Sequence, residues 1–192
     1  MTKPALPLVI TPGVPAARDL HSDHECFARL VRGDRTALAD LYDAHAGALF
    51  RHGMALTRRS TEAEDLVQSV FLKLATTGAP LLAVRNPANY LHRILHAAWI
   101  DNQRRPAVSR ESAGGVNDKE AGHARTSDVE SAIDVTRALA QLPPSQRQIV
   151  HLHLIEGFSF REAGRITRVS MFTAASRYRR ALARLRSLME NR

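Results

Sequence analysis

Apolar residues recur every three or four positions through most of the chain, which is the spacing of amphipathic helices. The pattern fills two blocks, at about 24–105 and 128–192, and neither block shows the strict alternation typical of strands. Residues 106–127 have no apolar periodicity and read as a flexible linker. Residues 1–23 contain four prolines and predict a disordered extension. The sequence therefore predicts an all-α fold of two small helical domains on a tether.

One predicted helix carries a residue that its own pattern does not explain. The stretch "EAEDLVQSVFLKLA", residues 62–75, places five apolar side chains along one side at 100° per residue: Leu66, Val67, Val70, Phe71 and Leu74. The opposite side carries Asp65, Gln68 and Ser69, and Leu72 lies among these polar groups. Burial in this domain therefore does not account for Leu72.

A second predicted helix, residues 87–105, has a side suited to nucleic acid. That side carries polar, basic and aromatic groups: His92, Arg93, His96, Trp99, Gln103 and Arg104. An exposed tryptophan between such groups can stack on an unpaired base, and the preceding loop, 76–87, can complete a pocket for a flipped-out base. The alternative is that Trp99 packs under this loop and the histidines are solvated.

Residues 159–186 predict a helix-turn-helix: a short helix "FREAGRIT", a turn, and a longer helix that begins at Ser170. Ser170 is the expected N-cap of that helix. Its free side presents hydroxyl groups and then arginines: Thr173, Ser176, Arg177, Arg180 and Arg184. Such a helix can enter a major groove, where its first turn reads base edges and its arginines bind guanine or phosphate.

The charge of the chain is concentrated at the same end. Of the formal net charge of +8, +7 lies in residues 143–192, where all ten basic residues are arginine. Such a terminus is typical of proteins that bind a polyanion. Cys26 is the single cysteine, which excludes an internal disulfide and suits a reducing compartment. No apolar run approaches the length of a membrane span, so we expect a soluble, cytoplasmic protein.

Three segments together resemble bacterial sigma factors of the sigma-70 family. The segments "EAEDLVQSVFLKL" and "YLHRILHAAWIDNQRR" are similar to region 2 of that family. The segment "ALAQLPPSQRQIVHLHLIEGFSFREAGRITRVSMFTAASRYRRALARLR" is similar to region 4. The resemblance covers about residues 24–105 and 130–188. It is strongest to the small extracytoplasmic-function (ECF) group, which keeps only these two regions.

The resemblance implies a role for each surface. The first set would bind the clamp of the polymerase β′ subunit and consists of Asp65, Gln68, Ser69 and Leu72. This contact would explain why Leu72 lies on a polar side. A second set would open and read the −10 element: His92, Arg93, His96, Trp99, Gln103 and Arg104. A third set would read the −35 element: Ser170, Phe172, Thr173, Ser176, Arg177, Arg180 and Arg184. The family also implies contact with the polymerase β flap and, as a hypothesis, sequestration by an anti-sigma factor.

Several positions depart from the family pattern. His96-Ala97 stands where these factors usually carry Arg-Asn, which indicates a changed −10 contact or base preference. Gly164 lies inside a short helix, where glycine costs about 1 kcal/mol relative to alanine. Arg168 occupies a turn position often held by glycine. Phe172 replaces a common glycine, and it either touches a thymine methyl or covers the turn.

Other classes of protein explain less of the sequence. An enzyme would need a phosphate loop, a nucleophile elbow or paired carboxylates, and none is visible. His21, His24 and Cys26 have metal-like spacing but no evident fourth ligand. A helix-turn-helix regulator would leave Leu72 and Trp99 unused, and a sigma mimic that binds a regulator without initiating transcription would not need the arginines. The sequence therefore predicts a non-enzymatic alternative sigma factor, without cofactor or metal, whose partners are core RNA polymerase and promoter DNA.

Overall fold

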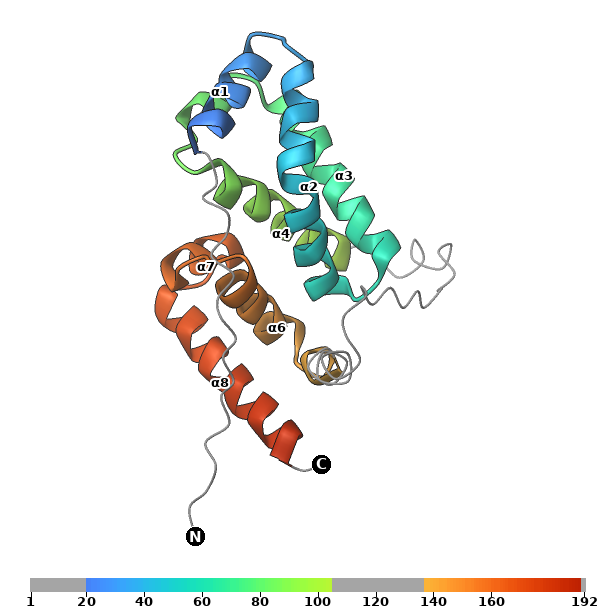
Figure 1. Ribbon diagram of the computed structural model, residues 1–192, viewed down its shortest axis with the longest axis vertical. Coiled ribbons are helices and arrows are strands. Elements are labelled where there is room, and N and C mark those ends of the chain that lie inside the picture. The colour runs from blue at the N-terminus through green and yellow to red at the C-terminus, as the bar shows by residue number, and fades with distance from the viewer. Residues whose placement is uncertain (1–19, 105–136, 191–192) are drawn as a thin grey trace, which may run out of the picture.

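The computed structural model describes residues 20–104 and 137–190, and the regular elements within these ranges are helical (Figure 1). The first range contains α1 (Leu20–Val31), α2 (Thr36–Thr57), α3 (Ser60–Thr77), the 3-10 turn η1 (Ala79–Ala83) and α4 (Pro87–Arg104). The second contains α6 (Pro144–Val150), the π-helical turn η3 (His151–Ile155), α7 (Phe160–Thr167) and α8 (Met171–Glu190). The all-α prediction is confirmed. The predicted linker, 106–127, and residues 1–19 lie outside the described ranges.

The helices of the first domain end beside residues whose backbone has a positive φ. Gly33 has φ 91° and Gly78 has φ 62°. Arg58, with φ 63°, ends α2 and donates its backbone N–H to the Met54 carbonyl. These residues reverse the chain between consecutive helices, so that α1, α2 and α3 form an antiparallel set (Figure 1).

The first helix begins earlier than the sequence predicted. Residues 20–23 were expected to belong to a disordered extension, but α1 already includes them. Asp23 is buried, and its Oδ1 lies 2.8 Å from Nε2 of His45 on α2. This contact between distant positions ties the start of α1 to the domain, and no periodicity within 1–23 could have revealed it.

The core of the first domain lies between α2, α3 and α4. The stripe predicted for α3 is buried, and Leu66, Val70 and Leu74 are each at most 1% exposed. Close packing of α2 on α3 requires Gly53, because a Cβ there would lie 2.9 Å from the Cβ of Ala63. The position and rotation of α3 therefore depend on a small-residue contact with α2.

The second domain contains the predicted helix-turn-helix, α7 and α8. Ser159 and Glu162 form a reciprocal capping box at the start of α7. Arg168 ends α7 in the left-handed conformation, with φ 57°. A Cβ on Gly164 would lie 2.8 Å from the Val169 carbonyl oxygen, so the glycine allows the turn to approach the helix. That close approach accounts for the departure noted at Gly164.

The two domains pack against each other. The C-terminal half of α2 contacts α6 and η3, and α4 contacts α7. In Figure 1, α6, α7 and α8 accordingly lie together along one side of the first domain, next to α4. Ala88 of α4 is 2% exposed and packs in one apolar cluster with Ile149 and Leu152 of the second domain. The domain interface is therefore part of the buried interior.

Candidate partner and nucleic-acid interfaces

The exposed side of α3 is the first candidate interface. Leu72 is 69% exposed, as the sequence predicted, although the opposite side of the same helix is buried. Asp65 and Gln68 are exposed beside it. Ser69 is half-buried, and its hydroxyl donates to the Asp65 carbonyl at 2.8 Å. The surface thus combines one leucine with neighbouring polar groups.

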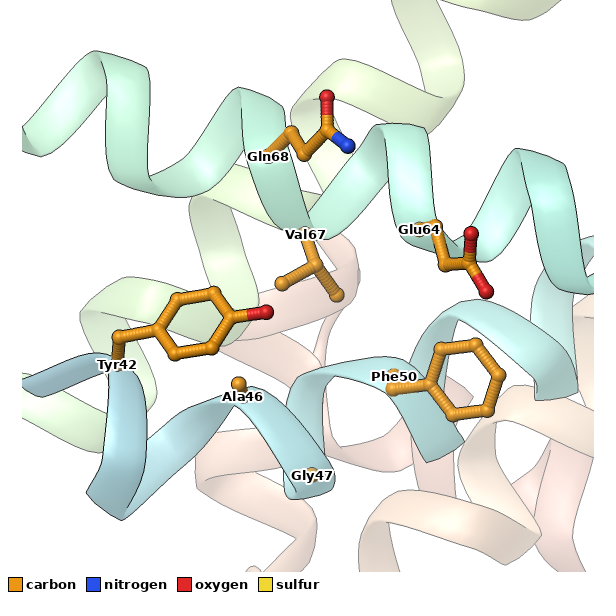
Figure 2. A pocket seen from close by; sticks show the side chains of 7 residues that line it. All are labelled: Tyr42, Ala46, Gly47, Phe50, Glu64, Val67 and Gln68. Carbon is orange, nitrogen blue, oxygen red and sulfur yellow. The ribbon is translucent and has the colours of Figure 1, made fainter.

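A hollow of 380 Å³ between α2 and α3 adjoins this surface (Figure 2). Figure 2 shows Tyr42 and Phe50 of α2 at opposite ends of the hollow, with Val67 of α3 between them. Gln68, part of the predicted set, also lines it. The α2 residues of this hollow were not predicted, although Tyr42, Ala46 and Phe50 have the four-residue spacing of one helical face.

The recognition helix α8 is the second candidate interface. Ser170 caps it as predicted, because the Thr173 backbone N–H donates to the Ser170 hydroxyl at 3.0 Å. Phe172 is 73% exposed and therefore does not cover the turn. Of the predicted arginines, Arg180 and Arg184 are exposed and Arg177 is half-buried. Ser176 is half-buried and accepts a hydrogen bond from Arg180 at 3.1 Å.

The predicted nucleic-acid side of α4 is divided by the domain interface. Arg93, Gln103 and Arg104 are exposed, and Trp99 is half-buried against the core of its own domain. The expectation that His92 and His96 face solvent is wrong, because they are only 1% and 5% exposed. The second domain covers them, and a pattern read from one helix does not reveal that cover.

His92 and His96 belong to a buried network that crosses the interface, formed with His52 of α2 and Gln148 of α6. The Nδ1 atoms of His92 and His52 lie 3.0 Å apart. Gln148 Nε2 lies 3.0 Å from His52 Nε2 and 2.8 Å from His96 Nδ1. We call these four residues the histidine network. The pattern of α4 alone does not reveal this network, because His52 and Gln148 lie on other helices.

Burial sets the charge of the histidine network. Desolvation, with further repulsion from the neighbouring imidazoles, holds the pKa of His52 well below its usual range. Desolvation, reinforced by Arg168 and Arg177, lowers the pKa of His96 to about 4. Both side chains are therefore neutral near pH 7 in this arrangement.

Arg147 forms a second connection between the domains. Its guanidinium donates to the carbonyls of Ala55 and Leu56, near the C-terminal end of α2. The same group donates to the carbonyls of Ala140 and Leu142 in its own domain. The side chain therefore satisfies carbonyls that the last turn of a helix leaves without intrahelical partners.

Glu156 provides a third connection. It is 2% exposed, and its Oε1 accepts from Arg51 of α2 at 3.0 Å. His151 Nε2 lies 3.4 Å from the same oxygen. Burial alone would raise the pKa of Glu156, but the imidazoles of His151 and His92 and the guanidinium of Arg51 outweigh it and lower the pKa to about 2. The carboxylate is therefore ionised at the interface.

The remaining chemistry-bearing groups do not assemble into a site. His24 Nε2 contacts the Val84 carbonyl at 2.9 Å, Cys26 is buried in the core, and His21 is exposed. Within residues 20–104 and 137–190, no three His, Cys, Asp or Glu side chains are placed to hold a metal ion. In the same part of the chain, no helix has both the length and the apolar character needed to cross a bilayer.

Family models match both halves of the chain. Residues 41–107 match sigma-70 region 2, and residues 132–185 match sigma-70 region 4. The ECF RNA polymerase sigma factor SigM of Mycobacterium tuberculosis (strain H37Rv) is 34% identical over 176 residues, which cover 90% of this chain and 87% of SigM. The chain belongs to the ECF sigma factors of the sigma-70 family. SigL from the same strain is 28% identical over 155 residues, 78% of this chain and 87% of SigL.

Two solved structures share the fold. CnrH, in complex with the cytosolic domain of CnrY, is 23% identical with a TM-score of 0.62, over 88% of this chain and 98% of CnrH. RpoE from Bartonella quintana, in complex with the anti-sigma factor NepR, is 27% identical with a TM-score of 0.59, over 75% of this chain and 91% of that chain.

Membership of this family defines the general activity. The ECF sigma factor binds RNA polymerase and DNA and directs transcription initiation. It is not an enzyme, because the polymerase supplies the catalysis. The region 2 match includes the surface of α3 and the whole of α4, and the region 4 match includes α7 and most of α8. Each candidate interface therefore lies in a matched region.

Proposed function

We propose that the ECF sigma factor binds core polymerase through the exposed side of α3. The observation that carries this proposal is Leu72, a leucine that is 69% exposed beside Asp65, Gln68 and Ser69. An apolar side chain among polar groups is typical of a partner surface that combines burial with polar specificity. The partner surface is the clamp of the β′ subunit, and the second domain contacts the β flap.

Promoter recognition is divided between α4 and α8 in this proposal. Arg93, Gln103 and Arg104 are exposed and would contact phosphates and bases at the −10 element, with Trp99 between them for stacking. His92 and His96 can join this surface only when the second domain moves away, because it covers them in the closed arrangement.

The −35 element is read by the first turns of α8. Ser170, Phe172 and Thr173 are exposed at the start of the helix, where a recognition helix meets base edges. The exposed ring of Phe172 is suited to contact a thymine methyl group. Ser176 and the arginines that follow, Arg177, Arg180 and Arg184, supply contacts to guanine or phosphate.

Regulation by an anti-sigma factor is supported by analogy. One of the matched structures is a complex with the anti-sigma factor NepR, and another is a complex with the cytosolic domain of CnrY. We place the protein in the cytoplasm with its polymerase. Purification that recovers polymerase but never a small inhibitory partner, under repressing conditions, would contradict this regulatory assignment.

Run-off transcription tests the function directly. Purified protein and bacterial core polymerase are combined with sheared genomic DNA of the host, and transcript 5′ ends are sequenced. Discrete starts that share two spaced upstream motifs, absent without the protein, are expected. Polymerase binding without any starts would indicate a sigma mimic. The absence of both polymerase binding and discrete starts would refute the proposal.

Leu72→Arg tests the polymerase surface. We expect loss of core polymerase binding with a free energy of unfolding within about 0.5 kcal/mol of the parent, because exposed positions contribute little to stability. Ala39→Arg, which adds the same cation on an exposed position of α2, is the matched control and is expected to bind normally. Normal binding by Leu72→Arg would exclude this side of α3 as the contact.

A further inference from the structure

We propose that the histidine network is a pH-sensitive latch that holds the free sigma factor closed. The network joins α2 and α4 of the first domain to α6 of the second, and its members are at most 5% exposed. Closure covers His92 and His96 and keeps the two domains together. A promoter-bound sigma factor must separate them, since it reads two elements that lie apart on the DNA.

The hydrogen bonds of the network require neutral histidines. The Nε2 of the Gln148 amide is a donor, so the two ring nitrogens it contacts, His52 Nε2 and His96 Nδ1, must accept. His52 then carries its proton on Nδ1 and donates it to His92 Nδ1. A second proton on the accepting nitrogen of any of these rings would replace a hydrogen bond by two opposed N–H groups.

Most groups packed around His52 and His96 disfavour protonation, but the Thr167 backbone favours a charged His96 and the Glu156 carboxylate favours a charged His92. Arg168, which ends α7, and Arg177 of α8 act on His96. The ring of His151 of η3 stacks on His52 with centroids 5.9 Å apart. Glu156 accepts from Arg51 of α2 and lies 3.4 Å from His151 Nε2, and it also interacts electrostatically with His92, so the pH response is assigned to His52 and His96. Arg147 of α6 adds a further cation at the interface.

Protonation is therefore linked to opening. In the closed form the pKa of His52 is well below 6.5 and that of His96 is about 4, whereas solvent-exposed imidazoles titrate near 6.5. The open form binds more protons between these values, so closure is most favourable above about pH 6.5 and weakens as the pH falls toward 4. Between pH 7.5 and 5.5, His96 alone weakens closure about tenfold, and His52 weakens it further in the same direction.

Thiol protection measures this opening in the full chain. Ala88, buried at the interface, is replaced by cysteine in a Cys26→Ala background, and its reaction rate with a thiol reagent is compared with that of a small thiol at the same pH. The protection factor should fall at least about tenfold from pH 7.5 to 5.5 while the helical circular dichroism stays constant. A protection factor near one at pH 7.5, or one that does not change with pH, would overturn the latch.

Two further variants assign the response to the network. Gln148→Glu places a carboxylate between His52 and His96, which favours their protonated forms in the closed state, so the fall should vanish or reverse. His21→Gln removes an exposed histidine of α1 and should leave the fall intact. An unchanged fall in Gln148→Glu would refute the assignment. The role of the latch in −10 recognition rests on the proposed function. The thiol assay contains neither polymerase nor DNA, so the latch and the proposed function can fail separately.

Discussion

Replacement of Gly164 by alanine separates helix propensity from tertiary packing. Alanine should stabilise the interior of α7 by about 1 kcal/mol if only the helix matters. The new Cβ, however, would lie 2.8 Å from the Val169 carbonyl oxygen and 3.3 Å from the Met171 nitrogen. The first distance is about 0.7 Å short of an ordinary contact, and both atoms are backbone, so the turn before α8 must move.

The expected result is a net loss. Overpacking of a well-packed site costs about 1–3 kcal/mol, which exceeds the gain in propensity, so the free energy of unfolding should fall by about 1 kcal/mol. Because the displaced turn carries the start of α8, binding to the promoter identified by run-off transcription should weaken as well. Urea unfolding followed by circular dichroism measures the first effect, and a mobility shift with core polymerase measures the second.

Gly47→Ala is the matched control for this prediction. A Cβ at Gly47, in the middle of α2, would meet only the flexible end of Arg51 at 3.8 Å. The same substitution should therefore stabilise the protein by about 0.5–1 kcal/mol. Equal stabilisation by both variants, with unchanged promoter binding, would refute the packing argument.

Two other predictions test the arginines of α8 and the packing of α2 on α3. Arg177→Ala should weaken promoter binding by about 1–3 kcal/mol and leave polymerase affinity unchanged in a pull-down with core enzyme; a loss of polymerase affinity would contradict the proposed division of surfaces. Gly53→Ala should lower the free energy of unfolding, measured in urea, by about 1–2 kcal/mol, because the new Cβ would lie 2.9 Å from that of Ala63. A stabilised variant would contradict the close packing of α2 on α3.

Local patterns predicted most helices because each depends on residues close in sequence. The buried stripe of α3 follows from helical periodicity. The N-cap at Ser170 was predicted for the same reason, since a cap involves a hydroxyl and a backbone N–H three residues later. The start of α1 was not predicted, because its anchor is the contact of Asp23 with His45.

The exposed leucine of α3 was correctly predicted because a helix with a complete buried stripe leaves its other side to solvent. The same reasoning failed for α4. Its polar side was assigned to solvent, but a second domain covers His92 and His96, and the partner that satisfies His96, Gln148, lies 52 positions away in the sequence. The periodicity of a single helix shows which side chains share a side, but it does not show whether solvent or another domain covers that side.

The sequence by itself determined the helices, the two-domain division, the family and the exposed candidate surfaces of α3 and α8. These features depend on periodicity, turn chemistry and motifs that are each contained in a short segment. Only the tertiary structure decided that the domains are closed on each other, that four side chains form a buried histidine network, and that Gly53 and Gly164 are required for close approach. Those features arise where segments distant in sequence meet, and a local pattern carries no information about that meeting.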